Sequence, residues 1–296
     1  MRHDQKGSIP ANHLLAVTGL GVRFPTPKGP VDVVKDLSFT LDRGQTLGIV
    51  GESGSGKSMT SLAIMGLLPK DAKVTGSILL NGSQTVDRSD AELRKLRGDS
   101  MAMVFQDPLS SLNPYYTVGL QITEAYRAHR NVSRRAARAV ALEAMAQVQI
   151  KDPQLRIDQY PHQFSGGMRQ RIMIAIALCC EPDLIIADEP TTALDVTVQA
   201  QILALMADLQ KETGAGMIFI THDLAVVSQV AQNVIVMNTG RPVESGTTEQ
   251  IFSAPAHPYT RALLNAIPRL DDDLEELKMV QEFTRPKVTP AAVTTS

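Results

Sequence analysis

Short apolar runs alternate with amphipathic or polar stretches along much of this chain. Residues 46–50, 184–187 and 217–221 are three such runs, and each is typical of a short buried strand. Helical patterns follow the first run, at residues 58–65, and precede the second, at residues 172–178. Because strands alternate with helices, the pattern predicts an α/β fold with a mostly parallel sheet.

The N-terminal and middle parts of the chain have different patterns. Residues 14–24 and 33–41 predict strands joined by a turn rich in proline and glycine, and residues 76–82 predict a further strand that ends in a turn. The segment from about residue 90 to 180 is rich in Ala, Arg, Glu and Gln, and we expect it to be helical. The charged run at residues 133–140 indicates a solvated helix face.

Composition narrows the class of protein. Apolar residues make up 43% and charged residues 20% of the 296 residues, as in a folded globular protein, and the formal net charge of −2 favours no nucleic-acid partner. The longest strongly apolar run, residues 172–180, is far shorter than the ~20 residues of a membrane span, and the polar start is no signal peptide. The two cysteines, Cys179 and Cys180, are adjacent in that run, so we expect core residues rather than a zinc site or disulfide. These features predict a cytosolic protein.

The run at residues 46–50 leads into a glycine-rich loop that satisfies the pattern G-x-x-x-x-G-K-[ST]. The loop consists of Gly51, Glu52, Ser53, Gly54, Ser55, Gly56, Lys57 and Ser58. With a strand before it and a helix after it, such a loop binds phosphate through backbone N–H groups and the positive end of the helix. We expect Lys57 to reach the β and γ phosphates of a nucleotide, and Ser58 to offer its hydroxyl to Mg²⁺.

Two further strand ends carry candidate catalytic groups. Residues 184–187 are followed by Asp188 and Glu189, at the carboxyl end where a parallel sheet places its ligands. Asp188 suits the Mg²⁺ shell, and Glu189 can polarise the attacking water. His222 follows residues 217–221 at the same predicted edge, so it can contact the γ-phosphate or orient that water.

Six motifs in a fixed order resemble those of the nucleotide-binding subunits of ATP-binding cassette (ABC) transporters. The order is the P-loop, a glutamine at Gln106, a signature within residues 164–171, the acidic strand end, a D-loop at residues 192–195 and a histidine at His222. The resemblance spans about residues 14–268. It implies a P-loop NTPase ABC cassette with a RecA-like core, an N-terminal antiparallel β subdomain and an inserted helical subdomain, at about residues 90–180, that contacts membrane subunits.

The resemblance also assigns roles to individual residues. Glu189 matches the catalytic base, His222 the switch histidine, and Gln106 the residue that senses Mg²⁺ and water beside the membrane-subunit contact. Phe24 falls at the position that stacks on adenine, although a core aromatic residue on a strand is the alternative. Stacking does not separate ATP from GTP, so the resemblance alone supplies ATP. The candidate Mg²⁺ ligands are Ser58, Gln106 and Asp188, and Asp195 matches the D-loop aspartate.

The signature has an interpretation of its own. Its glycines precede an apolar helical run, so they can present a helix N-terminus and open N–H groups that bind an anion, although a helix start without a ligand fits the pattern equally well. In the resembled family this surface contacts ATP held by a partner chain, which implies a head-to-tail pair with a second copy or a paralogue. The matching residues are Ser165, Gly166, Gly167 and Gln170, whereas Met168 and Arg169 depart from the commonest sequence of this motif.

The C-terminal part resembles the ATPases of oligopeptide and dipeptide uptake. Residues 256–264 and 266–268 carry this likeness, and residues 106–114 support the same branch. Many relatives continue into a cysteine-bearing extension, but no cysteine follows Cys180, so we expect no iron–sulfur cluster. We divide the chain into an ABC ATP-binding domain (12–247), an importer-type segment (248–270) and a tail (271–296) whose acidic and then Pro/Thr-rich composition predicts a flexible end.

We interpret the sequence as the ATP-hydrolysing subunit of a bacterial ABC importer, with di- or oligopeptides as the leading cargo. The expected partners are a second ABC ATPase subunit, two membrane permease subunits and, indirectly, an extracytoplasmic substrate-binding protein, with the chain peripheral at the cytoplasmic face of the inner membrane. Nickel, glutathione, opines and oligosaccharides stay open as other cargo. An exporter ATPase and a soluble ABC ATPase of translation or DNA repair are further alternatives. A purely regulatory ATP-binding module is disfavoured because Glu189 and His222 are both present.

Overall fold

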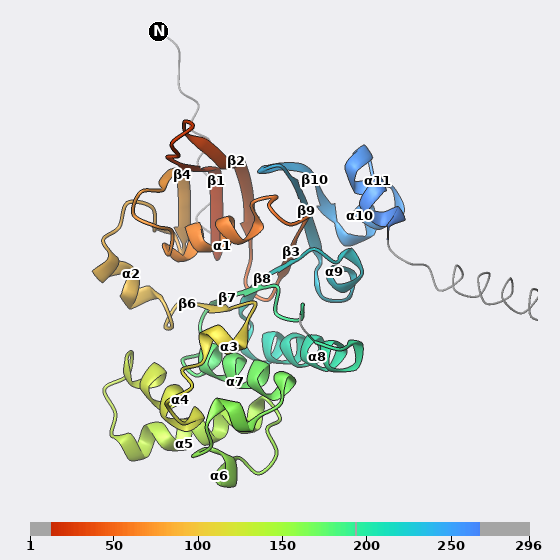
Figure 1. Ribbon diagram of the computed structural model, residues 1–296. Coiled ribbons are helices and arrows are strands. Elements are labelled where there is room, and N and C mark those ends of the chain that lie inside the picture. The colour runs from red at the N-terminus through yellow and green to blue at the C-terminus, as the bar shows by residue number, and fades with distance from the viewer. Residues whose placement is uncertain (1–12, 193, 267–296) are drawn as a thin grey trace, which may run out of the picture.

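The computed structural model describes residues 13–192 and 194–266, which form two β-sheets and a layer of helices (Figure 1). The larger sheet has the strand order β10-β9-β3-β8-β7-β6. Strands β9, β3, β8, β7 and β6 run parallel to one another, and β10 pairs antiparallel with β9 at one edge. The bounds are β3 Thr46–Val50, β6 Met101–Val104, β7 Leu184–Asp188, β8 Gly216–Thr221, β9 Asn233–Asn238 and β10 Arg241–Thr247.

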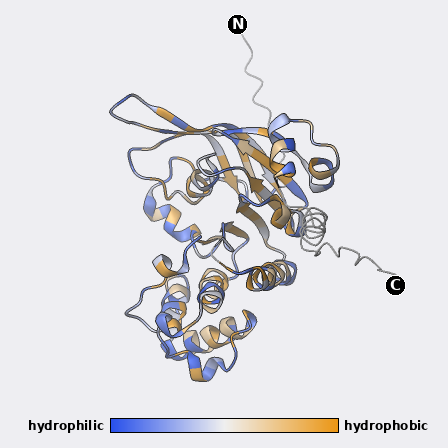
Figure 2. Ribbon diagram, turned by 45° about the vertical axis from the view of Figure 1, so that its right-hand side comes forward, coloured by the Kyte–Doolittle hydropathy of each residue, from blue (hydrophilic) through white to orange (hydrophobic). Residues whose placement is uncertain are grey.

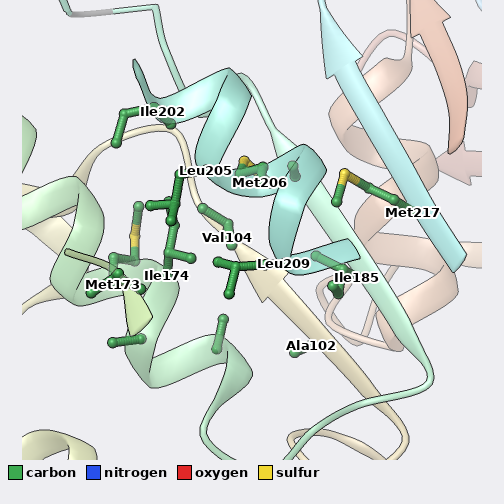
Figure 3. Packing of buried hydrophobic residues seen from close by; sticks show 14 of the residues in the cluster. Ala102, Val104, Met173, Ile174, Ile185, Ile202, Leu205, Met206, Leu209 and Met217 are labelled. Atoms are coloured by element: carbon green, nitrogen blue, oxygen red, sulfur yellow. The ribbon is translucent and has the colours of Figure 1, made fainter. Parts of the chain in front are cut away.

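The central strands are apolar except at their ends, because helices or strands cover both faces of the sheet. Every residue of β3, β7 and β8 is buried, as parallel sheets require. Helices α7 (Gly166–Leu178), α8 (Val196–Thr213) and α9 (Leu224–Val230) belong to the core on one face. Figure 3 shows this packing, in which Val104 and Ile185 of the sheet lie beside Ile174 of α7 and Leu209 of α8.

A second sheet, entirely antiparallel, covers the other face. Its strand order is β2-β1-β4-β5, with β1 at Leu15–Phe24, β2 at Val31–Leu41, β4 at Lys73–Leu80 and β5 at Ser83–Gln84. Helix α1 (Lys57–Met65) contacts strands of both sheets. One continuous cluster of buried side chains joins the two sheets and α1, and it includes Leu20, Ile64 and Ile218. The predicted α/β class with an N-terminal antiparallel sheet is confirmed.

Helices dominate the segment between residues 90 and 180. The helices before α7 are α2 Asp90–Leu96, α3 Pro108–Ser111, α4 Val118–Arg127, α5 Arg134–Gln147, α6 Pro153–Arg156 and a short 3₁₀ turn at Pro161–Gln163. Arg134, Arg135 and Arg138 of α5 are exposed, so the predicted solvated face is confirmed, and Figure 2 shows polar residues along the outer helices. The expectation of helix throughout this segment is wrong at β6, because a buried run of four apolar residues has no periodicity that separates strand from helix.

The chain ends, within the described residues, in two short helices beside β9 and β10 (Figure 1). These are α10 (Thr248–Ser253) and α11 (Pro258–Asn265). The tail at 271–296, which we expect to be flexible, lies outside the described residues. Cys179 and Cys180 are buried in the core at the end of α7, as the sequence predicts. Among the helices that the structure describes, none is long and apolar enough to cross a membrane.

We expect truncation of the central strand to be costly. Phe219 on β8 is the bulkiest of the fully buried side chains, and Phe219→Ala should lower the free energy of unfolding by about 3–5 kcal/mol, because it leaves a cavity in a close-packed core. Urea unfolding measures this change. The control Leu155→Ala removes a side chain that is 79% exposed and should change the free energy by less than about 0.5 kcal/mol. A loss below about 1 kcal/mol for Phe219→Ala would contradict the packing described here.

Candidate active site

The P-loop connects β3 to α1 in a backbone conformation that requires glycine at two positions. Gly51 has φ 152° and Gly56 has φ 100°. A Cβ atom would lie 2.2 Å from the carbonyl oxygen of Met237 at the first position, and 2.5 Å from that of Val33 at the second. Gly56 also caps α1 without any side-chain hydrogen bond to the first turn. The N–H groups at the start of α1 therefore remain free to bind an anion.

Lys57 is held against the loop that precedes it. Its side chain is buried, and its Nζ donates hydrogen bonds to the carbonyl oxygens of Gly51 (2.7 Å) and Glu52 (2.9 Å). An ammonium group has three donors, so one remains for a phosphate oxygen. Burial lowers the pKa of Lys57, whereas the carboxylates of Glu189 and Asp188 act in the opposite direction. An anionic ligand in the cleft would therefore favour the charged form of Lys57 in the same direction as these carboxylates.

Ser58 and Asp188 lie together although 130 residues separate them in the chain. The Ser58 hydroxyl donates to Asp188 Oδ1 at 3.0 Å, and Ser61, one helical turn later, donates to Asp188 Oδ2 at 3.4 Å. Burial raises the pKa of Asp188, the hydrogen bond from Ser58 opposes this, and the charge of Glu189 adds to it. A buried carboxylate beside a hydroxyl is a donor set of hard oxygen atoms, which suits Mg²⁺. The residues present therefore fit the predicted metal.

Three side chains from three different segments converge on one oxygen of Glu189. Its Oε2 accepts hydrogen bonds from Gln106 Nε2 at 3.1 Å and Thr192 Oγ1 at 2.9 Å, and His222 Nδ1 lies 3.4 Å from the same atom. The Glu189 side chain is only 14% exposed, and its backbone has φ 48°, a strained value for a residue with a side chain. The hydrogen bonds from Gln106 and Thr192 hold the carboxylate in its position.

A cleft of about 840 Å³ brings most of the predicted nucleotide-binding residues together. Of the predicted loop residues, Gly51 and Ser55 do not line this cleft, and Ser55 is buried. Phe24 is half-buried at the edge of the core and lines the cleft, where its ring is available for stacking. The lining residues are Phe24, Val33, Glu52, Ser53, Gly54, Gly56, Lys57, Ser58, Met59, Gln106, Glu189 and His222.

Sequence reasoning missed several side chains at the site. Ser61 was detectable because it follows Ser58 by three residues and so shares its helix face. Thr192 was noticed only as part of the D-loop, and its hydrogen bond to Glu189 depends on the turn after β7. Val33 reaches the cleft from β2, and no local signal marks it.

The signature residues and Asp195 lie elsewhere. Ser165 caps α7 by accepting a hydrogen bond from the Met168 N–H at 3.4 Å, and Asp195 caps α8 in the same way. Ser165 and Gly166 are exposed. Within the described residues, none of the four signature residues lines the cleft that contains Lys57.

Gln170 differs from the other signature residues because it is buried. It is 1% exposed, and its Nε2 has no hydrogen-bond partner among the described residues. It lies in the second turn of α7, where it lines a cavity of about 140 Å³ together with Gln106, Pro190 and Leu194. A direct contact between Gln170 and partner-bound ATP therefore requires the side chain to move outward, whereas Ser165 and Gly166 need no such movement.

The parallel sheet, the P-loop and the two carboxylates at the carboxyl end of β7 define an ATPase built as an ATP-binding cassette. The chain belongs to the ABC transporter family. The sequence model described as "ABC transporter" matches residues 34–192, and a second, described as "Oligopeptide/dipeptide transporter, C-terminal region", matches residues 243–289. The resemblance drawn from the motifs, to the ATPases of oligopeptide and dipeptide transport, is thus confirmed. As a member of this family, the chain is an ATPase of a transporter.

Relatives with assigned names cover nearly all of the chain. The oligopeptide transport ATP-binding protein OppD of Haemophilus influenzae is 52% identical over 266 residues, which cover 90% of this chain and 82% of that protein. The dipeptide transport ATP-binding protein DppD of Bacillus subtilis is 54% identical, over 89% of this chain and 79% of that protein. Among solved structures, the dimeric ATP-binding cassette MJ0796 bound to ADP and Pi has a TM-score of 0.71 at 28% identity, over 79% of this chain and 98% of that one.

We expect Lys57→Ala to weaken nucleotide binding itself. Loss of the charged donor that faces the cleft should lower the affinity for ATP by about 10- to 100-fold, because a hydrogen bond to a charged group contributes about 1.5–3 kcal/mol. Equilibrium titration with ATP measures the effect. Lys95→Ala, an exposed lysine in the last turn of α2, is the matched control and should bind normally. Unchanged affinity in Lys57→Ala would argue against the phosphate cradle.

Proposed function

We propose that this chain hydrolyses ATP to power an importer of di- and oligopeptides, at the cytoplasmic face of the membrane. The observation that carries the catalytic part is the convergence of Gln106, Thr192 and His222 on Glu189, at the mouth of the P-loop cleft. The peptide cargo rests on the match of the C-terminal region and on the names of the relatives.

The geometry supports separate roles for the residues around the phosphates. The N–H groups of the loop and the start of α1 bind the phosphate oxygens, with Lys57 beside the β and γ groups. Ser58, Asp188 and Gln106 would hold Mg²⁺, which neutralises developing phosphate charge when bound. The hydrogen bonds described above engage Oε2 of Glu189, and Oε1, which has no hydrogen-bond partner among the described residues, would accept a proton from the attacking water. His222, at 53% exposure, can turn between Glu189 and the γ-phosphate.

The site requires a second ATPase subunit. Ser165 and Gly166 are open at the surface at the start of α7, but they do not line this chain's own cleft. In a head-to-tail pair, this surface contacts ATP in the partner's P-loop, and the partner's signature covers Lys57 and Ser58. The similar cassette MJ0796 is described as a dimer in a post-hydrolysis state. The partner of this chain is either a second copy or a paralogue.

An exposed apolar surface beside Gln106 suits the permease subunits. It combines large exposed side chains from the loop before α3, from α3 itself, from the loop between α3 and α4, and from the start of α4. The surface consists of Phe105, Leu109, Tyr115, Tyr116 and Leu120, with exposures from 40% to 84%. Gln106 lies at its edge and reaches Glu189, so the same loop touches both the docking surface and the catalytic carboxylate. An extracytoplasmic binding protein would act only through the permeases.

Glutathione, itself a small peptide, is a second candidate cargo. The glutathione import ATP-binding protein GsiA of Escherichia coli is 52% identical over 88% of this chain, which spans 43% of that protein. Reconstitution of the chain with its permeases and binding protein in vesicles, followed by ATP-dependent uptake of labelled dipeptide, oligopeptide or glutathione, decides between them. Uptake of nickel or a sugar, with none of a peptide, would overturn the proposed cargo and leave the ATPase assignment intact.

We expect Glu189→Gln to bind ATP and yet lose hydrolysis. Glutamine keeps the shape and the hydrogen-bonding reach of the side chain but cannot accept a proton, and removal of a general base lowers kcat by about 10²–10⁴-fold. Phosphate release by the assembled complex gives kcat, and ATP titration gives the affinity. Glu212→Gln, at an exposed glutamate near the end of α8, should retain both. Turnover near that of the native chain in Glu189→Gln would rule out the assigned base.

We expect Asp188→Asn to stabilise the empty chain and to abolish its response to magnesium. Burial disfavours the ionised carboxylate of Asp188, so removal of the charge should raise the Tm of the nucleotide-free chain by a few degrees, at ~2–4 °C per kcal/mol for a chain of this size. Thermal unfolding with ATP, with and without Mg²⁺, should show a magnesium-dependent rise in Tm for the native chain and not for the variant. Asp71→Asn, at an exposed position, should behave like the native chain. A lower Tm in nucleotide-free Asp188→Asn would contradict the expectation.

A further inference from the structure

Residues 256–264 mark a subfamily, but nothing in the active site described so far gives them a physical task. In the structure, the start of α11 is anchored to β10. The Glu244 carboxylate accepts hydrogen bonds from the N–H groups of Ala256 (2.7 Å) and His257 (3.0 Å). His257 Nδ1 in turn accepts one from the N–H of Tyr259 (3.2 Å). The Tyr259 ring is half-buried and packs against the main core, so its position is fixed from two sides.

The fixed Tyr259 hydroxyl reaches the P-loop. Tyr259 Oη accepts a hydrogen bond from the N–H of Glu52 at 3.2 Å, across 207 residues of sequence. That N–H belongs to the peptide group between Gly51 and Glu52, and the carbonyl oxygen of the same group accepts Lys57 Nζ at 2.7 Å. A trans peptide is planar, and its N–H and C=O point in opposite directions. A hydroxyl that fixes one end of this group therefore also fixes the carbonyl that holds Lys57.

We propose that Tyr259 is a positioning residue for nucleotide binding, which makes the C-terminal segment part of the nucleotide site. Tyr259 does not line the cleft among the described residues, so it acts through the loop and not on the nucleotide. The Gly51 carbonyl, held by Tyr259, and the Glu52 carbonyl occupy two donors of the Lys57 ammonium, and the third is directed to the phosphates. The inference rests on the proposed function to the extent that the cleft binds ATP.

The substitution Tyr259→Phe separates this role from ordinary packing of α11. Packing depends on the aromatic ring, whereas positioning depends on Oη. The substitution therefore removes the hydrogen bond to the loop and keeps the packing of the ring. A loop that is less well ordered before binding lowers affinity, because the cost of ordering it is then part of binding. The rate of the chemical step depends on Glu189 and should stay unchanged. Tyr126→Phe is the matched control, since Tyr126 is also partly buried against the same core but lies on α4, away from the loop.

The test compares native chain, Tyr259→Phe and Tyr126→Phe by equilibrium titration with MgATP and MgADP, by thermal unfolding, and by ATPase kinetics in the assembled transporter. For Tyr259→Phe we expect Kd for both nucleotides and KM for ATP to rise about 2- to 10-fold, as for the loss of a single hydrogen bond. Its kcat should stay within about twofold of the native value. Its Tm should match that of the native chain, because a single solvent-exposed hydrogen bond contributes little to global stability. Tyr126→Phe should match the native chain throughout.

Unchanged nucleotide affinity in Tyr259→Phe, while the native chain binds ATP normally, would overturn the inference and leave the proposed function standing. A fall in kcat at constant KM would overturn it as well, because Tyr259 would then act on the chemical step. A loss of affinity accompanied by an equal loss in Tyr126→Phe, or by a lowered Tm, would assign the effect to packing. If the native chain fails to bind ATP, the proposed function itself fails, and the inference with it.

Discussion

The carboxyl ends of β3, β7 and β8 meet at one edge of the parallel sheet, and the rest of the site depends on this alignment. Parallel neighbours share a direction, so the residues that follow each strand come together however far apart they are in sequence. This is why Ser58 reaches Asp188, and why His222 lies beside Glu189. The antiparallel sheet then adds Phe24 to this edge, and Gln106 joins it from the segment that follows β6, the parallel neighbour of β7.

The same rule explains which parts were predictable from sequence. A glycine loop or a carboxylate directly after an apolar strand carries local information, so the P-loop, Asp188, Glu189 and His222 could be placed before the fold was seen. Strand β6 could not, because four buried residues have no diagnostic period. Nor could the burial of Gln170 or the contact between Tyr259 and Glu52, since both depend on how distant segments pack. Local chemistry was therefore predictable, and tertiary contacts were not.

Three segments that are distant in sequence line the small cavity around Gln170. The segment after β6 contributes Gln106 and Pro108, α7 contributes Gly166 and Gln170, and the segment after β7 contributes Pro190 and Leu194. Gln106, which lines this cavity, also donates a hydrogen bond to Glu189. The surroundings of Glu189 and the start of α7 are therefore neighbours within a single chain.

The adjacent glycines of the signature are constrained by different neighbours. A Cβ at Gly166 would meet only Leu194 Cδ2, at an ordinary 3.9 Å, whereas a Cβ at Gly167 would lie 2.6 Å from Val198 Cγ1 on α8. The two positions therefore differ in what a larger side chain would meet: at position 167 it would displace Val198 of α8, whereas at position 166 it would stand at the exposed start of α7. Alanine at position 167 would thus disturb the fit between two helices, and alanine at position 166 would alter only the surface.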